Sequence, residues 1–270
     1  MRDQLKNVKI IYVPIHYIKR CFVWIWCGFG RIVSKLFRKK RSDIAGFKNL
    51  YPGRRCFIIA TGPSLRLEDL ELLKNEITFS MNSIINLYDK TSFRPTFYML
   101  QDGRVEKRFR EKLADMGSSK VFIGAGNTYG FDVNISPKTV RRFHPNCYMY
   151  YLDTAYHFYN MCYRKPKADI QFSEDCSGAI KDGYTVTYSA LQLAVYMGFR
   201  EIYLLGCDAN YAGHVDEKTD GGENKPLHMH IKAYAAAKEY ADSHNVKIYN
   251  ATRGGMLELF PRVSLDDLVP

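Results

Sequence analysis

The sequence contains no CxxC pair, although it has seven cysteines, and their number is odd. Scattered single cysteines argue against a disulfide framework or a zinc site and indicate a reducing compartment, the cytoplasm. The chain also lacks internal repeats, low-complexity tracts and an uninterrupted apolar run of the roughly 20 residues that a membrane-spanning helix needs. Because 46% of its 270 residues are hydrophobic, the chain can nevertheless build a well-filled core.

The positive charge of the chain is concentrated near its start. The whole sequence has a formal net charge of +11, and residues 1–45 hold eleven Lys and Arg against Asp3 and Asp43. This segment therefore carries +9 of the total, and the other 225 residues carry only +2. Because the basic residues form an appendage on a nearly neutral body, we do not expect nucleic acid to be a partner.

The basic segment has the pattern of an amphipathic helix. Its apolar residues recur at steps of three or four: Ile11, Ile15, Ile18, Phe22, Ile25, Phe29, Val33 and Leu36. The apolar run at residues 21–30 is too short to span a bilayer, and no signal-peptide cleavage site follows it. We therefore expect residues 1–45 to lie on an anionic membrane surface, peripheral at the inner face of the cell membrane. A helix packed on the body or on a partner is the alternative.

After this segment, short apolar runs alternate with stretches of helical periodicity. We expect strands at residues 56–60, 77–81, 96–100, 120–124, 147–151, 201–206 and 246–250. We expect helices at residues 65–74, 104–115, 185–197, 229–243 and 264–268. This order predicts an α/β fold over residues 54–270: a Rossmann-like, doubly wound, mainly parallel sheet with helices on both faces. Residues 47–55 are predicted as a linker, and the irregular stretch 125–183 as a lid-like insertion.

The segment FIIATGPSL, residues 57–65, joins the first expected strand to the first expected helix. A buried strand, a turn containing Gly62 and Pro63, and a helix start form the first half of a βαβ unit. Backbone N–H groups at such a helix start favour phosphate, whereas the alternative is a turn that needs Gly and Pro only for its dihedral angles. The motif alone leaves both interpretations open, because it is much weaker than a full glycine fingerprint.

Polar residues follow four of the expected strands. They are Thr61, Gly62, Pro63 and Ser64 after the first strand, Asn82 after the second, Asp102 and Arg104 after the third, and Gly206 and Asp208 after the strand at 201–206. The carboxyl ends of parallel strands meet at one edge of a sheet, where ligands bind in open α/β folds. We therefore expect these residues to converge on a substrate site.

A long polar loop at residues 209–228 ends in His228 and His230. A histidine that is neutral near pH 7 can remove a proton from a hydroxyl group. The His-x-His pair can also bind a metal, but no further clustered ligand is apparent, so we expect no metal site. The alternative is that both histidines face solvent on the loop.

Three stretches of the sequence resemble known families: FIIATGPSL, TVTYSALQLAVYMGFREIYLLGCDANY at 185–211, and HIKAYAAAKEYADSHNVKIYNATRGGMLELFPR at 230–262. They are similar to bacterial lipooligosaccharide sialyltransferases (glycosyltransferase family 42) and to the 6-hydroxymethylpterin diphosphokinase MptE-like family. The ending GGMLELFPR favours the second, broader group. Both resemblances imply one Rossmann-like domain that binds a nucleotide-activated substrate.

The sialyltransferase resemblance implies roles for individual residues. The donor-binding motif of that family corresponds to Thr61, Gly62, Pro63 and Ser64, with Thr61 in place of its Asn, and its second donor-binding Asn corresponds to Asn82. Its helix-opening motif falls on Thr185 and Thr187, and its Gly-x-Asp on Gly206 and Asp208. The tyrosine that assists the leaving phosphate corresponds to Tyr211, with one residue inserted. The general-base histidine falls where His228 and His230 stand.

These residues together predict a glycosyltransferase. It would move a sugar from a nucleotide-activated donor to a glycan or glycolipid acceptor in bacterial surface polysaccharide assembly. The sugar could be of the sialic-acid type, carried by a CMP donor. We expect no cofactor. One alternative is a Mg²⁺-dependent diphosphokinase in which Asp102 and Asp208 help to hold the metal for ATP. The other is a non-catalytic nucleotide- or glycan-binding assembly factor. The sequence leaves open whether the chain forms a homo-oligomer.

Overall fold

The computed structural model describes residues 18, 21, 22, 25, 43–125, 135–154, 170–209 and 227–269. Its strands are β1 (Arg55–Ile59), β2 (Thr78–Met81), β3 (Phe97–Leu100), β4 (Lys120–Ala125), β5 (Cys147–Asp153), β6 (Ile180–Lys181), β7 (Glu201–Leu205) and β8 (Lys247–Asn250). Its α-helices are α3 (Leu67–Leu72), α4 (Gly103–Phe109), α5 (Pro137–Val140), α7 (Val186–Tyr196), α8 (Leu227–Ser243) and α9 (Leu265–Leu268). Its 3-10 helices are η2 (Ala45–Phe47), η3 (Asn82–Leu87) and η4 (Glu111–Met116).

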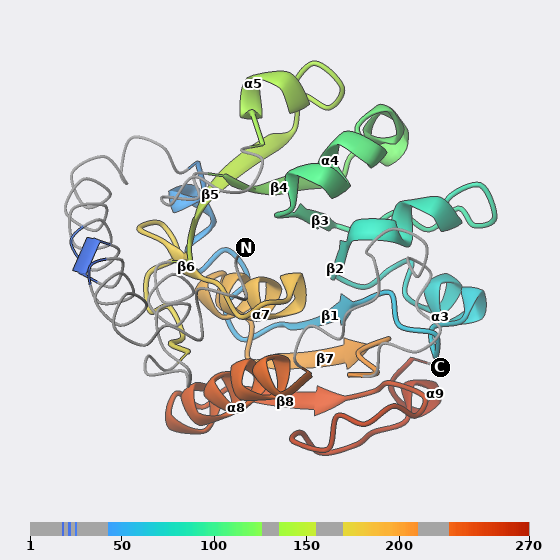
Figure 1. Cartoon of the computed structure of the whole chain (residues 1–270). Helices are drawn as coiled ribbons and strands as arrows, with labels where there is room; N and C mark the ends of the chain where they lie inside the picture. The colour runs from blue at the N-terminus through green and yellow to red at the C-terminus, as the bar shows by residue number, and fades with distance from the viewer. Residues whose placement is uncertain are drawn as a thin grey trace, which may run out of the picture.

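All strands of the described residues join one parallel sheet in the order β6-β5-β4-β3-β2-β1-β7-β8 (Figure 1). The chain builds outward from β1 to β6 and then returns to add β7 on the other side of β1. This arrangement confirms the predicted Rossmann-like parallel sheet. The reversal of strand order between β1 and β7 is a topological switch point, the place where open α/β sheets commonly have a ligand-binding crevice beyond the carboxyl ends of their strands.

Each face of the sheet carries its own hydrophobic core. In β1, Cys56 and Ile58 point into the core under α7 and α8, whereas Phe57 and Ile59 point into the core under α3, η3, α4 and η4. Successive strand residues face opposite sides, so a strand covered on both faces is apolar without alternation. The continuous run that predicted β1 therefore has a direct structural cause.

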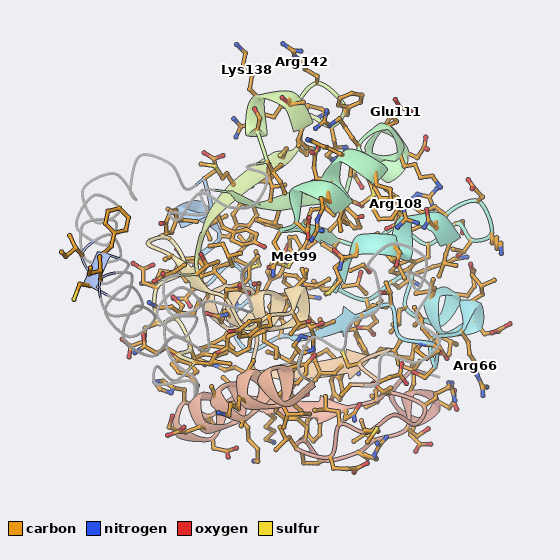
Figure 2. All side chains as sticks on the ribbon, viewed as in Figure 1. Arg66, Met99, Arg108, Glu111, Lys138 and Arg142 are labelled. Atoms are coloured by element: carbon orange, nitrogen blue, oxygen red, sulfur yellow. The ribbon has the colours of Figure 1, made fainter. Side chains whose placement is uncertain are left out.

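Apolar side chains of the strands fill the interior, and charged side chains of the outer elements point to the surface. Met99 of β3 is fully buried in the sheet, whereas Lys138 and Arg142 point outward from α5 and the turn after it (Figure 2). Helices therefore cover the central strands on both faces.

The expected helix at 104–115 is instead α4 followed by η4, and the region predicted as a lid contributes to the sheet. Strand β5 pairs with β4, and β6, which was not predicted, pairs with β5. Two residues are too few to give β6 a recognisable pattern. The remainder of that region, residues 126–134 and 155–169, lies outside the described residues.

The folded body begins before the predicted boundary at residue 54. Ile44 is fully buried and Phe47 is 7% exposed, and both pack in the core under α7. The backbone N–H of Asp43 donates to the Met149 carbonyl of β5 at 2.9 Å. Phe47 of the predicted linker therefore belongs to the folded body, and so do Asp43 and Ile44 at the end of the predicted basic segment.

Within residues 1–42, the structure describes four positions. Ile18, Cys21, Phe22 and Ile25 are all helical, and Ile18, Phe22 and Ile25 are 67%, 65% and 63% exposed. They share one helix face because they are three or four residues apart. Across the part of the chain that the structure describes, none of the helices combines the length and hydropathy needed to cross a bilayer.

Candidate functional site

The four polar strand ends predicted from the sequence lie side by side. They belong to β3, β2, β1 and β7, which are consecutive neighbours in the parallel sheet. Strands β1 and β7 flank the switch point, where the connections after these two strands leave in different directions. The site is therefore built on the crevice at the carboxyl ends of β1 and β7.

Hydrogen bonds join the turn after β1 to the end of β7. The Gly62 N–H donates to the Gly206 carbonyl at 2.9 Å, and Ser64 donates to Asp208 Oδ2 from its N–H at 3.3 Å and from its hydroxyl at 2.9 Å. A Cβ on Gly62 would lie 1.8 Å from Asp208 Oδ2, so glycine is required there. Both N–H groups are engaged within the protein. Phosphate binding by this turn stays a prediction that would need other groups.

The loop after β8 closes on Asp208 from the other side. The Met256 N–H donates to the Asp208 carbonyl at 2.7 Å, and a Cβ on Gly255 would lie 2.6 Å from Asp208 Cα. Asp208 is only 4% exposed as a result. Its carboxylate thus ties the β1 turn to β7, and Thr61, at 9% exposed, is buried beside it while Pro63 is exposed.

Asn82 stands at the end of β2, next to β1, in an unusual state. Its backbone has φ of +49°, and its carbonyl accepts a hydrogen bond from the Tyr98 hydroxyl at 2.5 Å. Its side-chain oxygen Oδ1 is buried and has no hydrogen-bond partner in the described structure. Buried polar atoms are rarely left unpaired, so Asn82 is a candidate ligand contact.

The end of β3 supplies a helix cap. Asp102 is the N-cap of α4 and accepts a hydrogen bond from the Arg104 N–H at 2.7 Å, while the Arg104 guanidinium lies 3.5 Å from the same carboxylate. Gln101, one residue earlier, accepts a hydrogen bond from the Ser189 hydroxyl of α7 at 2.8 Å. The N-terminal turn of α7 is therefore held over the end of β3.

Thr185 is the N-cap of α7, and its hydroxyl accepts a hydrogen bond from the Thr187 N–H at 3.3 Å. Thr187 itself is 2% exposed, and its hydroxyl donates to the sulfur of Met81 at 3.4 Å. The start of α7 therefore lies against the end of β2. A helix N-terminus at this position favours an anionic ligand group.

His230 lies in the first turn of α8 and is only 7% exposed. Burial lowers its pKa to about 4, and a hydrogen bond to the backbone of Tyr184 opposes this shift. The imidazole is therefore neutral at pH 7, the form that can accept a proton. His228 lies in the same helix turn, but its side chain is outside the described residues, as is the whole of Tyr211 together with residues 210–226.

The sequence analysis missed Tyr234, one helical turn beyond His230. It is 5% exposed, and its hydroxyl lies close to the side chains of Thr185, Thr187 and Cys207. Burial raises the pKa of the Cys207 thiol to about 12, so this group is a neutral packing partner. The spacing of four residues from His230 places both side chains on one helix face, and that was the available signal.

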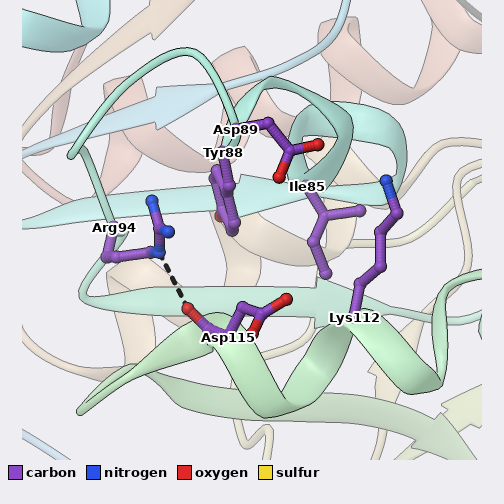
Figure 3. Close-up of a pocket in the computed structure, with 6 residues that line it drawn as sticks. All are labelled: Ile85, Tyr88, Asp89, Arg94, Lys112 and Asp115. Carbon is purple, nitrogen blue, oxygen red and sulfur yellow. Dashed lines mark hydrogen bonds between the residues drawn. The ribbon is translucent and has the colours of Figure 1, made fainter.

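A separate pocket of about 370 Å³ lies away from this crevice, where the chain enters β3 and β4 (Figure 3). Its lining residues are Ile85, Tyr88, Asp89, Arg94, Lys112 and Asp115. Arg94 donates to the Asp115 carbonyl at 2.8 Å and covers the Tyr88 ring at 4.3 Å, and Lys112 donates to Asn86 at 3.0 Å. The two cations therefore already have protein partners. Among the residues that the structure describes, no group of three or more His, Cys, Asp or Glu side chains is placed to hold a metal.

Residues 31–214 match the family described as 6-hydroxymethylpterin diphosphokinase MptE-like. The chain belongs to this family. The match spans the crevice from the β1 turn through Asp208, and it ends before α8, which carries His230 and Tyr234. No curated protein matches the chain.

Solved structures share the fold. The MAf glycosyltransferase from Magnetospirillum magneticum AMB-1 is 20% identical with a TM-score of 0.53, over 86% of this chain and 38% of that chain. The sialyltransferase CstII from Campylobacter jejuni is 16% identical with a TM-score of 0.49 in complex with CMP-3FNeuAc, over 78% of this chain and 85% of that chain. This chain thus spans about two fifths of the length of the MAf glycosyltransferase, and the fold is one that glycosyltransferases use.

Proposed function

We propose that this domain transfers a sugar from a nucleotide-activated donor to a hydroxyl of a glycan or glycolipid acceptor, in the assembly of a bacterial surface polysaccharide. The observation that carries the proposal is Asn82, whose buried Oδ1 lacks a partner in the described structure, one strand from the switch point. Nucleosides and sugars offer hydroxyl and amino donors to such an oxygen, whereas an ionised phosphate offers only acceptors. A nucleotide sugar bound across the crevice would satisfy it.

The donor phosphate would lie at the start of α7. As the glycosidic bond breaks, negative charge builds on the leaving phosphate, and the N-terminal N–H groups of the helix stabilise it. Thr185, which is partly exposed, is the hydroxyl at this point. Thr61 and Pro63 would border the donor on the β1 side, and we assign Tyr211 to the leaving phosphate by resemblance alone.

His230 would be the general base. The acceptor oxygen attacks the anomeric carbon, the bond from that carbon to the phosphate oxygen breaks, and the neutral imidazole takes the acceptor proton. A pKa of about 4 makes a weak base, and general bases work best near the ambient pH. The negative charge of a bound donor raises the pKa of a nearby histidine, so donor binding would itself activate the base.

The family description favours a second candidate, a Mg²⁺-dependent diphosphokinase. In that reaction Asp102 and Asp208 were expected to share the metal. They follow β3 and β7, which are three strand spacings apart in the sheet, or about 14 Å at about 4.8 Å per spacing. Because Mg²⁺ ligands lie about 2.1 Å from the ion, these two carboxylates do not suit one site. A strict Mg²⁺ requirement for turnover would restore this candidate.

The basic segment would hold the domain on an anionic membrane surface. The described residues Ile18, Phe22 and Ile25 present an exposed apolar helix face, and eleven Lys and Arg lie in residues 1–45. This combination is typical of a helix in the membrane interface. The full chain should sediment with anionic vesicles at low salt and not with zwitterionic ones. Equal sedimentation with both would remove the electrostatic part of the proposal.

Donor binding tests the central claim. We would measure thermal shifts of the wild type with CMP, UDP, GDP, ATP and a pterin, because a ligand at 100 times its Kd stabilises the fold by about 2.7 kcal/mol. Asn82→Gly removes the amide but keeps the left-handed backbone, and it should abolish the shift. Asn49→Gly is the matched control, since Asn49 is exposed and has φ of +53°. A shift that survives in Asn82→Gly, or one given only by pterin with ATP, would contradict the proposal.

A further inference from the structure

A strained turn lies between β6 and α7. Tyr184 has φ of +63°, a left-handed conformation that is uncommon for a bulky side chain. Its N–H donates to Asp182 Oδ1 at 3.0 Å, and Asp182 in turn donates its own N–H to the Asp153 carbonyl of β5 at 3.1 Å. Asp182 is 7% exposed. The carboxylate thus fixes the left-handed turn, and the end of β5 holds the carboxylate's residue in place.

The same turn is wedged between the two helices of its face. A Cβ on Gly183 would lie 2.2 Å from Cδ1 of Tyr188 in α7 and 2.8 Å from Cβ of Ala233 in α8. Only glycine lets the two helices approach the turn this closely. The backbone of Tyr184 is thereby brought to the first turn of α8, where it forms a hydrogen bond with His230.

The direction of that hydrogen bond follows from its effect. It favours the protonated imidazole, so the ring donates and the Tyr184 carbonyl accepts. A neutral imidazole has one N–H and one bare nitrogen. If the N–H is committed to the turn, the other ring nitrogen carries the lone pair and is the basic one.

The helix that carries His230 is also fixed against this segment. The hydroxyl of Tyr234, four residues later, lies close to the side chains of Thr185 and Thr187, directly after the turn. Two side chains of α8 therefore contact residues 184–187 at adjacent points. These two contacts together fix the position of the His230 ring relative to the start of α7.

We infer that the Asp182–Tyr184 turn is the positioning element for His230, taking one ring N–H on the Tyr184 carbonyl and leaving the other ring nitrogen as the proton acceptor. This inference rests on the proposed function for its catalytic meaning, but the tautomer itself does not depend on it. Strained backbone that surrounding structure holds in place is characteristic of functional sites. Catalytic bases are generally oriented by a neighbouring group. Here the Tyr184 carbonyl would orient His230, and the Asp182 carboxylate would hold Tyr184.

The tautomer can be read directly on the full chain by long-range ¹H–¹⁵N NMR of the histidine ring. Wild-type His230 should be a single neutral tautomer at pH 7. Asp182→Ala should give a mixture and lower kcat about 10- to 100-fold with little change in KM. Asp182→Asn, which keeps the acceptor oxygen, should restore both. Asp175→Ala is the matched control, because Asp175 accepts the Ser177 N–H at 3.0 Å in an exposed turn elsewhere.

A second variant separates the backbone of Tyr184 from its ring. Tyr184→Gly adopts a left-handed φ without strain and keeps the carbonyl, so the tautomer should stay single. A mixed tautomer in the wild type, a change in Tyr184→Gly, or no change in Asp182→Ala would each overturn the inference. If the tautomer behaves as expected and no donor gives turnover, the positioning stands and the transferase proposal fails. If the wild type turns over a donor and Asp182→Ala has the same kcat, the transferase proposal stands and the positioning inference fails.

Discussion

Two turns stand at the same edge of the sheet and are built in opposite ways. The turn after β1 uses its N–H groups on β7, through Gly62 to Gly206 and Ser64 to Asp208. The turn before α7 satisfies its N–H within itself, through Tyr184 to Asp182, and offers its carbonyl to His230 of α8. The first turn joins two strands, and the second contacts a buried, neutral histidine.

The comparison shows that a familiar motif need not leave its backbone N–H groups open to a ligand. Gly-Pro-Ser after a buried strand is the pattern that attracted a phosphate-site prediction, yet its amides are engaged within the protein. The Asp-Gly-Tyr turn has no recognisable motif, yet it contacts the buried histidine. What separates them is where their hydrogen bonds go, and a buried backbone group must always have such a destination.

The largest effect should come from Gly62→Val, which breaks the first turn. Its Cβ would lie 1.8 Å from Asp208 Oδ2 and 2.5 Å from the Gly206 carbonyl, so strand ends must shift. We expect the free energy of unfolding to fall by about 4 kcal/mol or more, measured by urea denaturation. Gly46→Ala is the control, since a Cβ there meets nothing within 4 Å. If Gly62→Val is as stable as the wild type, the turn after β1 does not pack closely against Gly206 and Asp208 at the end of β7.

A smaller effect on the free energy of unfolding should come from the second turn, and it should depend on pH because only this turn contacts a histidine. His230 has a pKa of about 4 when folded against 6.5 for the ordinary group. Between these values the unfolded chain binds more protons, so the free energy of unfolding should fall as the pH drops from about 6.5 to 4. The whole shift corresponds to about 3 kcal/mol.

His230→Gln isolates this contribution, because the carboxylates that also titrate below pH 6 are common to both proteins. The difference in stability between wild type and His230→Gln should shrink steadily as the pH falls to 4. His244→Gln is the control, since His244 is exposed in the turn after α8. A difference between wild type and His230→Gln that does not depend on pH would mean that His230 is not a buried neutral group.

Much of the fold was readable from the sequence, because parallel strands covered on both faces are apolar throughout. Residues 56–60 and 201–206 gave that signal, and β1 and β7 pair along their whole length. The two-residue strand β6 gave none, because its place depends on pairing with Leu152 and Asp153 of β5. Likewise Ile44 and Phe47 are isolated apolar residues, and only the packed structure shows that they cover the sheet.

The site was readable only in part. The convergence of four strand ends follows from strand order, and the sheet places them together as predicted. The contact between Tyr184 and His230 depends on how α7 and α8 pack, which no local pattern encodes. The backbone angles of Asn82 and Tyr184 were equally hidden, since Asn adopts left-handed angles only sometimes and Tyr seldom does.

The smallest effect should come from Ser64→Ala, which tests what the first turn is for. The Ser64 hydroxyl donates to Asp208 Oδ2 at 2.9 Å across two strands, and its N–H donates to the same oxygen. Ser177 makes the same pair of bonds to Asp175 Oδ1, at 2.6 Å and 3.0 Å, within an exposed local turn. Removing a hydrogen bond to a charged group costs about 1–3 kcal/mol when the acceptor stays buried and much less when water replaces the donor.

Ser64→Ala should therefore lower the free energy of unfolding by about 1–2 kcal/mol, and Ser177→Ala by no more than about 0.5 kcal/mol. Nucleotide affinity, measured by calorimetry, decides the remaining question. If Ser64 serves only to join β1 and β7, the variant is less stable but binds the donor as tightly as the wild type. If its hydroxyl also contacts the donor, as the resemblance to sialyltransferases implies, affinity falls as well. Equal losses of stability in the two serine variants would remove the distinction between a turn that joins strands and a turn that is merely local.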